Sequence, residues 1–182
     1  MPFLWNLGVV FIGIMFLTTS TDKVMHWRKH LGSMEAYKII KGALIKWFLV
    51  LFVIGELFIS FSLFLTGITF LNFMVFLLIL FTYSLAILIN LLRGNTNISC
   101  GCGSVLDHDH LSIGLIIRNL CLIAIYIFLY IEKNTTVALI QLSLEEILSY
   151  ILLATGVLIL YGIIREIRQN VVLTRKIKKM LS

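Results

Sequence analysis

The sequence predicts an all-α integral membrane protein: a bundle of about five transmembrane helices, a four-helix core plus one, with an amphipathic surface helix between the first two. Sixty per cent of the 182 residues are hydrophobic, and the mean hydropathy is +1.03. Only 13% are charged, against about 25% in soluble chains, so most of the surface cannot face water. A single proline agrees with long, uninterrupted helices.

The first three transmembrane helices follow from the positions of charged residues. Residues 1–21 carry no charged side chain, and they lack the basic start and cleavage site of a signal peptide, so they predict a retained first helix. The next uncharged run, 57–92, would be about 54 Å long as one helix, which exceeds the bilayer. A turn at "GITFLN", 67–72, therefore divides it and predicts helices at 46–66 and 70–92.

Two further helices are predicted in the second half of the chain. Residues 111–131 form an apolar run interrupted by Arg118, and 144–164 form the last one. Ser143 precedes that last helix, and Glu146 follows three residues later, which is the pattern of a capping box.

The remaining segments are polar connections within a single membrane domain, 1–182. Residues 22–45 place apolar side chains at three- and four-residue spacing among Lys and His, which predicts an amphipathic surface segment on the lipid. These apolar residues are Val24, Trp27, Leu31 and Met34. Residues 93–110 form a cysteine-containing loop, and 165–182 form a basic tail.

The distribution of basic residues predicts the orientation in the membrane. Five crossings put 22–46, 93–110 and the tail on one face, and Lys133 on the other. The first face carries Lys23, Arg28, Lys29, Lys38, Lys41, Lys46, Arg93, Arg165, Arg168, Arg175, Lys176, Lys178 and Lys179. Because basic loops stay inside, we expect a multi-pass protein of the plasma membrane with the cysteine loop and the tail in the cytoplasm. The net charge of +6 therefore indicates a membrane face rather than a nucleic-acid partner.

The stretch "NISCGCGSVLDHDH", 97–110, carries the chemistry most open to interpretation. Cys100 and Cys102 flank Gly101, and Gly103 follows. A disulfide needs Cα atoms about 4.4–6.8 Å apart, which neighbours at i and i+2 reach only where the chain bends, as glycine permits. The small ring that such a disulfide closes is strained, and a strained disulfide favours thiol–disulfide exchange. The start of the next helix also favours the thiolate. A redox-active dithiol is the first interpretation.

The same stretch also has the residues of a metal site. Cys100, Cys102, His108 and His110 form C-x-C-x5-H-x-H, a ligand set that suits zinc or copper. A solvated polar loop explains the two histidines equally well, so both alternatives stay open.

Two charges lie inside predicted transmembrane helices, where they are costly and usually paired or functional. From the same face, Glu56 lies about ten residues deep and Arg118 about seven, roughly 15 and 10 Å. We therefore expect an ion pair between them, with Asn119 bridging helices as a buried amide.

Three further residues are weaker candidates. Cys121, one turn beyond Arg118, is a third thiol or a small buried hydrophobe. Lys23 and Tyr37 lie near the membrane surface on the cysteine side, where they would line the site.

The order of these residues resembles the MauE (methylamine-utilisation) family of DoxX-like membrane proteins over about residues 5–130. The resemblance rests on Lys23, Tyr37, Glu56, "NLLRGNTNISCGCGS" and "RNLCL". The family usually has "CGCFG" where this chain has "CGCGS". Carried over by position, Cys100 and Cys102 match the redox pair and Glu56 the intramembrane acid. The surrounding motif is matched by Arg93, Gly94, Gly103, Arg118 and Asn119.

This resemblance implies a redox-associated function. Proteins of the family accompany thioredoxin-fold partners and support disulfide formation in other proteins. The architecture is also similar to that of vitamin K epoxide reductase, in which the cysteines face outward. That orientation is opposite to the one given by the charges of this chain, which we retain.

The sequence therefore favours a membrane thiol–disulfide oxidoreductase that exchanges electrons with a thioredoxin-fold or other thiol protein through Cys100 and Cys102. Arg118 would stabilise the thiolate, and Glu56 would hold Arg118 or move protons. The electrons imply a quinone or a second dithiol protein as acceptor. A metal-binding or metal-transport protein, and a structural or immunity-type membrane protein, are the alternatives.

Overall fold

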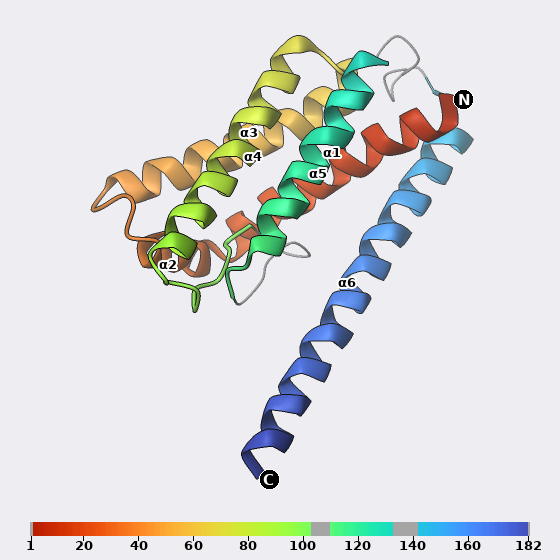
Figure 1. Ribbon diagram of the computed structural model, residues 1–182. Helices are drawn as coiled ribbons and strands as arrows, with labels where there is room; N and C mark the ends of the chain where they lie inside the picture. Colours follow the sequence, from red (N-terminus) through yellow and green to blue (C-terminus); the bar gives the residue numbers. More distant parts are fainter. Residues whose placement is uncertain (1, 103–109, 133–141, 182) are drawn as a thin grey trace.

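The computed structural model describes residues 2–102, 110–132 and 142–181, which form helices and connections without a strand (Figure 1). The elements are α1 (Pro2–Met25), α2 (Trp27–Ala36), α3 (Leu44–Thr66), α4 (Phe70–Leu92), α5 (Ile113–Ile131) and α6 (Leu144–Leu181). Five of them are long and apolar enough to cross a membrane, and α2 is too short. The predicted class, an all-α multi-pass membrane protein, is confirmed.

The bundle is built around α1, which packs against α3, α5 and α6, while α4 packs against both α3 and α5. Its core consists of aliphatic and aromatic side chains such as Ile12, Ile59, Leu63, Phe76 and Tyr126. Large apolar side chains also cover the outside, because lipid rather than water surrounds a spanning helix. Examples are Leu51, Leu78, Ile125 and Leu152.

The tight turn expected at 67–72 separates α3 from α4. Gly67 ends α3 with a positive φ of 72°, which glycine adopts without a steric penalty. Thr69 and Asn72 then form a capping box: each side chain accepts a hydrogen bond from the other residue's backbone N–H. The hydroxyl of Tyr126 donates to Asn72 Oδ1 at 2.9 Å, which ties α5 to the turn.

The segment predicted to lie on the membrane surface is divided between the end of α1 and the short helix α2. The helix α1 continues to Met25, and α2 begins only after a break at His26. On α2 the buried side chains are the polar His30 and Ser33. The apolar residues are outside or half-buried: Val24 is 57% exposed, and Trp27, Leu31 and Met34 are intermediate. The polar side of α2 thus covers the protein, which leaves its apolar residues available to lipid.

The last helix is longer than predicted. Ser143 and Glu146 form the expected capping box, in which the N–H and hydroxyl of Ser143 donate to the Glu146 carboxylate. Tyr150 and Ala154 pack against Val10 of α1. Residues 165–181 of the predicted basic tail continue α6 without a break beyond the apolar part of the helix, which ends at Ile164. Its far end projects away from the other helices (Figure 1).

Candidate functional site

Cys100 and Cys102 are joined by a disulfide in the connection between α4 and α5, with their Cα atoms 5.3 Å apart. The bend that brings them together depends on Gly101, whose φ is 65°. Both cysteines are buried, at 6% and 4% exposure. The predicted pair of bonded thiols is therefore present, and it lies inside the protein rather than on an open loop.

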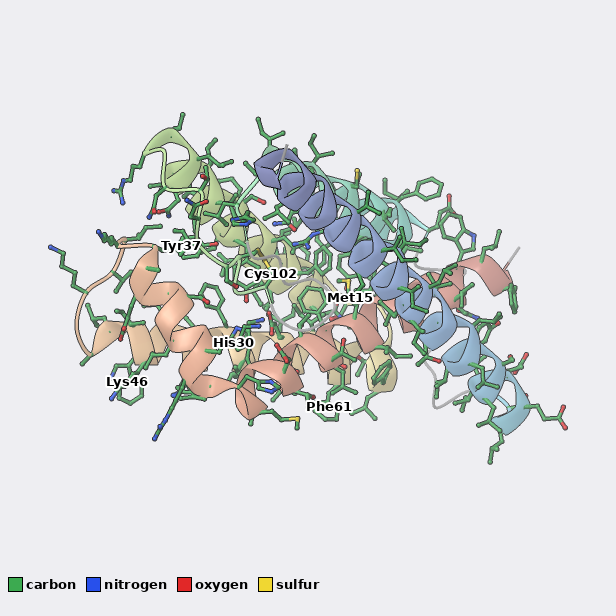
Figure 2. The ribbon with its side chains drawn as sticks, turned by 90° about the horizontal axis from the view of Figure 1, so that it is seen from below. Met15, His30, Tyr37, Lys46, Phe61 and Cys102 are labelled. Atoms are coloured by element: carbon green, nitrogen blue, oxygen red, sulfur yellow. A yellow bond between two sulfur atoms is a disulfide. The ribbon has the colours of Figure 1, made fainter. Side chains whose placement is uncertain are left out.

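The polar side of α2 and the residue that follows it cover this bridge. Tyr37 donates from its hydroxyl to the Cys100 carbonyl at 2.9 Å. A Cβ at Gly101 would lie 3.3 Å from the Cβ of Ser33, so a larger residue would meet α2 as well as backbone strain. Asn95 donates to the Ala36 carbonyl at 3.2 Å, which fixes the end of α2 to the segment before the cysteines. Figure 2 shows His30, Tyr37 and Cys102 grouped in this part of the molecule.

Beneath the bridge lies a buried charge cluster, formed by Lys23 of α1, Glu56 of α3 and Tyr83 of α4. The Lys23 ammonium donates to both carboxylate oxygens of Glu56, at 2.7 and 2.9 Å. Tyr83 donates from its hydroxyl to Glu56 Oε1 at 2.7 Å. Lys23 and Glu56 are each 1% exposed, so this is a fully buried ion pair. Lys23 also donates to the Cys102 carbonyl at 3.3 Å, which connects the cluster directly to the bridge.

The predicted ion pair between Glu56 and Arg118 is wrong: in the described part of the chain, Glu56 pairs with Lys23. The physical reason is the length of α1, which carries Lys23 into the bundle rather than onto its surface. Arg118 is half-buried and donates to Asn119 Oδ1 at 3.1 and 3.3 Å. Asn119 in turn donates to Ser84 at 3.2 Å, the bridge between helices that was expected of it.

Arg118 nevertheless lies near Glu56 and Cys102. A small cavity of about 10 Å³ has Glu56, Cys102, Arg118 and Asn119 in its wall. Two basic side chains therefore lie near Cys102: Lys23 bonds to its carbonyl oxygen, and Arg118 shares the wall of this cavity with it.

The other predicted site residues have varied places. Arg93 caps the end of α4, and Gly94 follows with a φ of 72°. Cys121 is a free, exposed thiol on α5 rather than a buried one. His110 is exposed, whereas His108 and Gly103 lie outside the described residues. Among those the structure describes, no group of three or more His, Cys, Asp or Glu side chains is placed to hold a metal ion.

Sequence reasoning missed three residues of this site: Tyr83, Ser33 and His30. Tyr83 lies within a predicted transmembrane helix, and the signal that could have found it is a hydroxyl that needs a partner when buried. His30 and Ser33 are three residues apart on α2, a spacing that puts both polar side chains on one face of a helix and could have indicated them. His30 is held by Asp22, whose Oδ2 lies 2.9 Å from its Nε2.

Beside the bridge is an apolar cavity of about 120 Å³. It lies between α2, α3, α4 and the cysteine segment, and Lys23, His30, Tyr37, Phe52, Tyr83, Cys100 and Cys102 are in its wall. The disulfide therefore borders this apolar cavity as well as the buried charge cluster.

Comparison with known proteins identifies a family. The family model described as "Methylamine utilisation protein MauE" matches residues 1–132. That range contains α1 to α5, the bridge and the buried charge cluster, and it ends before α6 begins. No curated protein and no solved structure gives a match.

Proposed function

Because this chain is a multi-pass membrane protein that belongs to the methylamine utilisation protein MauE family, we propose that it is a thiol–disulfide oxidoreductase. Its redox group would be the Cys100–Cys102 pair, and its partner a thioredoxin-fold protein or another protein with a pair of thiols. The observation that carries the proposal is a buried disulfide whose Cys102 carbonyl is held by the ammonium of a buried ion pair.

The arrangement suits exchange better than a structural cross-link. A bridge between residues i and i+2 closes a loop too short to restrict the unfolded chain appreciably, so it contributes little stability by that route. A buried ion pair is likewise weak evidence for stability, because desolvation of the two charges offsets their attraction. The disulfide and the ion pair lie next to each other, and a function that uses the cysteine sulfurs accounts for both.

The reaction would proceed through a mixed disulfide. A partner thiolate attacks the sulfur of Cys100, the Cys100–Cys102 bond breaks, and Cys102 leaves as a thiolate. A second thiolate of the partner then attacks the mixed disulfide and releases Cys100. Two electrons pass from the partner's dithiol to the Cys100–Cys102 pair. The two protons lost by the partner's thiols protonate the thiolates of Cys100 and Cys102.

The surroundings of the two cysteines favour Cys100 as the sulfur that is attacked and Cys102 as the one that leaves. Lys23 bonds to the Cys102 carbonyl, and Arg118 lies in the wall of the small cavity that Cys102 also lines. Positive charge stabilises a departing thiolate. Glu56 holds Lys23 in position through both its oxygens, and Tyr83 fixes the carboxylate. Glu56 and Tyr83 thus position Lys23 rather than touch the sulfur themselves.

The test is a single-turnover oxidation of a reduced dithiol peptide by the purified, oxidised protein. Wild type should convert one equivalent of peptide, while Cys100→Ser and Cys102→Ser should convert none, because neither thiol completes the exchange alone. Cys121→Ser is the matched control and should behave as wild type.

The same assay separates this function from the metal alternative. Replacing both His108 and His110 by Ala should leave peptide oxidation within about twofold, since neither takes part in the exchange. Stoichiometric zinc or copper in the purified protein, lost together with activity in this double variant, would contradict the redox function.

We also propose that the pair lies on the cytoplasmic side of the plasma membrane. The basic residues of the segments on that side of a five-crossing topology support this orientation. After reduction, a membrane-impermeant thiol reagent should leave both cysteines unlabelled in intact cells and label them in lysed cells. Equal labelling in intact cells would reverse the orientation.

A further inference from the structure

The apolar cavity beside the bridge has the size and the lining of a site for one ring. Its volume of about 120 Å³ compares with the roughly 150 Å³ of an apolar cavity that admits benzene. The wall is mostly aliphatic and aromatic, with Ile45, Leu49, Phe52 and Ile87 among its residues. It also includes the two bonded cysteines, so an occupant would lie against the redox group.

The cavity lies beside the lipid-facing surface of the bundle. Two residues of its wall, Ile39 and Phe48, are 40% and 38% exposed. Around them on the first turns of α3, Leu44, Trp47 and Leu51 are more than half exposed. A ligand dissolved in the membrane would therefore meet an apolar surface that continues into the cavity wall.

One polar group in this wall has an unused hydrogen-bonding atom. His30 is 1% exposed, and its Nδ1 has no hydrogen-bond partner among the described residues. The other ring nitrogen, Nε2, lies 2.9 Å from Asp22 Oδ2. Because an ionised carboxylate only accepts, Nε2 carries the proton, and Nδ1 accepts from a ligand when the ring is neutral and donates when it is protonated. A buried polar atom without a partner is costly, so a ligand that supplies one is favoured.

From these observations we infer that the cavity is a site for a lipid-soluble quinone, which accepts electrons from the Cys100–Cys102 pair. The quinone ring would lie between α2, α3 and α4 against the bridge, with one ring oxygen accepting a hydrogen bond from Nδ1 of the protonated His30 ring. This inference rests on the proposed thiol–disulfide exchange, and it names the electron acceptor of that same site.

The chemistry balances with the quinone as the oxidant. The two thiols of the reduced pair give up two electrons and two protons and form the Cys100–Cys102 bond. The quinone takes up both electrons and both protons and becomes a quinol. Protonated His30 donates a proton to a quinone oxygen, and neutral His30 takes one from the thiol side, so the residue turns over unchanged.

The occupant is a quinone rather than a second dithiol protein or a lipid chain for three reasons. The cavity holds a ring but not a protein loop. An acyl chain would fill the apolar space but leave His30 Nδ1 without a partner. Of these three, a quinone alone combines an apolar ring, a polar oxygen and the capacity for two electrons.

The site is tested first by binding, with a short-chain azido-ubiquinone as the photoprobe and decyl-ubiquinone as competitor, on the full-length protein in lipid nanodiscs. We expect labelled peptides from α2 and the start of α3, with labelling removed by the competitor. Ala86→Phe fills the cavity from α4 and should lower labelling about tenfold, because the ring no longer fits. Ala124→Phe, the same change at an exposed position of α5, should not.

A second cavity variant guards against misfolding of the first. Thr82 lines the cavity, and its hydroxyl bonds to the Leu78 carbonyl of its own helix, so the hydrogen bond that Thr82→Phe removes lies within α4. Both variants should elute as wild type and keep the disulfide. Labelling that spreads over the lipid-facing helices, and that neither cavity variant lowers, would show a quinone dissolved in lipid only and would overturn the inference.

Electron transfer is then measured as quinol formed by the reduced protein. His30→Phe should lower this rate by about tenfold or more, whereas Ala124→Phe, at the exposed position of α5, should leave it at the wild-type value. An unchanged rate would overturn the role of His30. The double variant Cys100→Ser, Cys102→Ser should keep photolabelling and form no quinol.

These readouts separate failure of the site from failure of the exchange. If the cavity variants lower the photolabelling but the wild-type protein oxidises no peptide, the quinone site stands and the proposed function fails. If the protein oxidises peptide but neither cavity variant lowers the photolabelling, the function stands and the quinone site fails.

Discussion

The bundle has two buried polar clusters along α4, one at its start and one just past its middle, and the two differ in charge. At the start of α4, Asn72 bonds to the Gly67 carbonyl, to Ser62 and to the Tyr126 hydroxyl, and all of these groups are neutral. Towards its other end, Tyr83 bonds to Glu56, which is paired with Lys23 beside the cysteines. The neutral cluster closes a turn and ties helices together. The charged cluster lies against a bridge and a cavity, where a costly ion pair indicates a function.

Of the changes that test the difference between the two clusters, Glu56→Gln is expected to have the largest effect on stability. The change leaves the Lys23 ammonium buried without its counter-ion, so we expect a loss of about 3–5 kcal/mol in the free energy of unfolding. Peptide oxidation should also fall, because Lys23 loses its fixed position. The measurement is reversible unfolding in mixed micelles, followed by the single-turnover assay on the folded fraction.

The pairing itself is tested by a double-mutant cycle. Lys23→Met together with Glu56→Gln should be less destabilised than the sum of the two single changes, since no lone charge remains. Additive effects would show that the two residues do not interact, and would remove the charged cluster from the site.

A smaller effect is expected at the neutral end. Asn72→Ala leaves the Tyr126 hydroxyl and the Gly67 carbonyl without their partner, which should lower the unfolding free energy by about 1–3 kcal/mol. Peptide oxidation by the folded protein should be unchanged, because Asn72 bonds to Ser62, Gly67 and Tyr126, which are not residues of the site. A loss of activity equal to that of Glu56→Gln would mean that the two clusters do not differ in role.

The smallest of these effects is expected from Tyr37→Phe. It removes one buried hydrogen bond, from the Tyr37 hydroxyl to the Cys100 carbonyl, and should cost about 0.5–1.5 kcal/mol. Because this bond holds the bridge under α2, we expect faster reaction of the disulfide with dithiothreitol. Slower reaction would show that Tyr37 activates the bridge instead of covering it.

Most of the helices could be predicted from the sequence, because hydropathy and charge determine which segments cross a membrane. The turn at Gly67 and the cap at Ser143 follow from local chemistry, and both are present. The end of α1 could not be located in this way, because polar residues such as Lys23 remain helical when a neighbouring helix satisfies them.

The site was predictable where its signal is local in sequence. The spacing of Cys100 and Cys102 around a glycine indicates a bridge by itself. The counter-ion of Glu56 depends on which helices touch: α1 packs against α3, so Lys23 rather than Arg118 reaches the acid. The sequence indicates an amphipathic surface segment, but which of its polar residues lie against the bundle depends on tertiary packing, which buries His30 and Ser33.

The most direct measurement of the central claim is capture of the mixed disulfide in the membrane. Cys100→Ser and Cys102→Ser variants, each also carrying Cys121→Ser, are expressed in cells, trapped with acid and an alkylating reagent, and analysed by mass spectrometry. The account predicts a covalent adduct with a thiol protein when Cys100 is retained, and a weaker or absent adduct when only Cys102 remains. Equal recovery of wild type and both variants as monomers, with no adduct in any of them, would contradict the account.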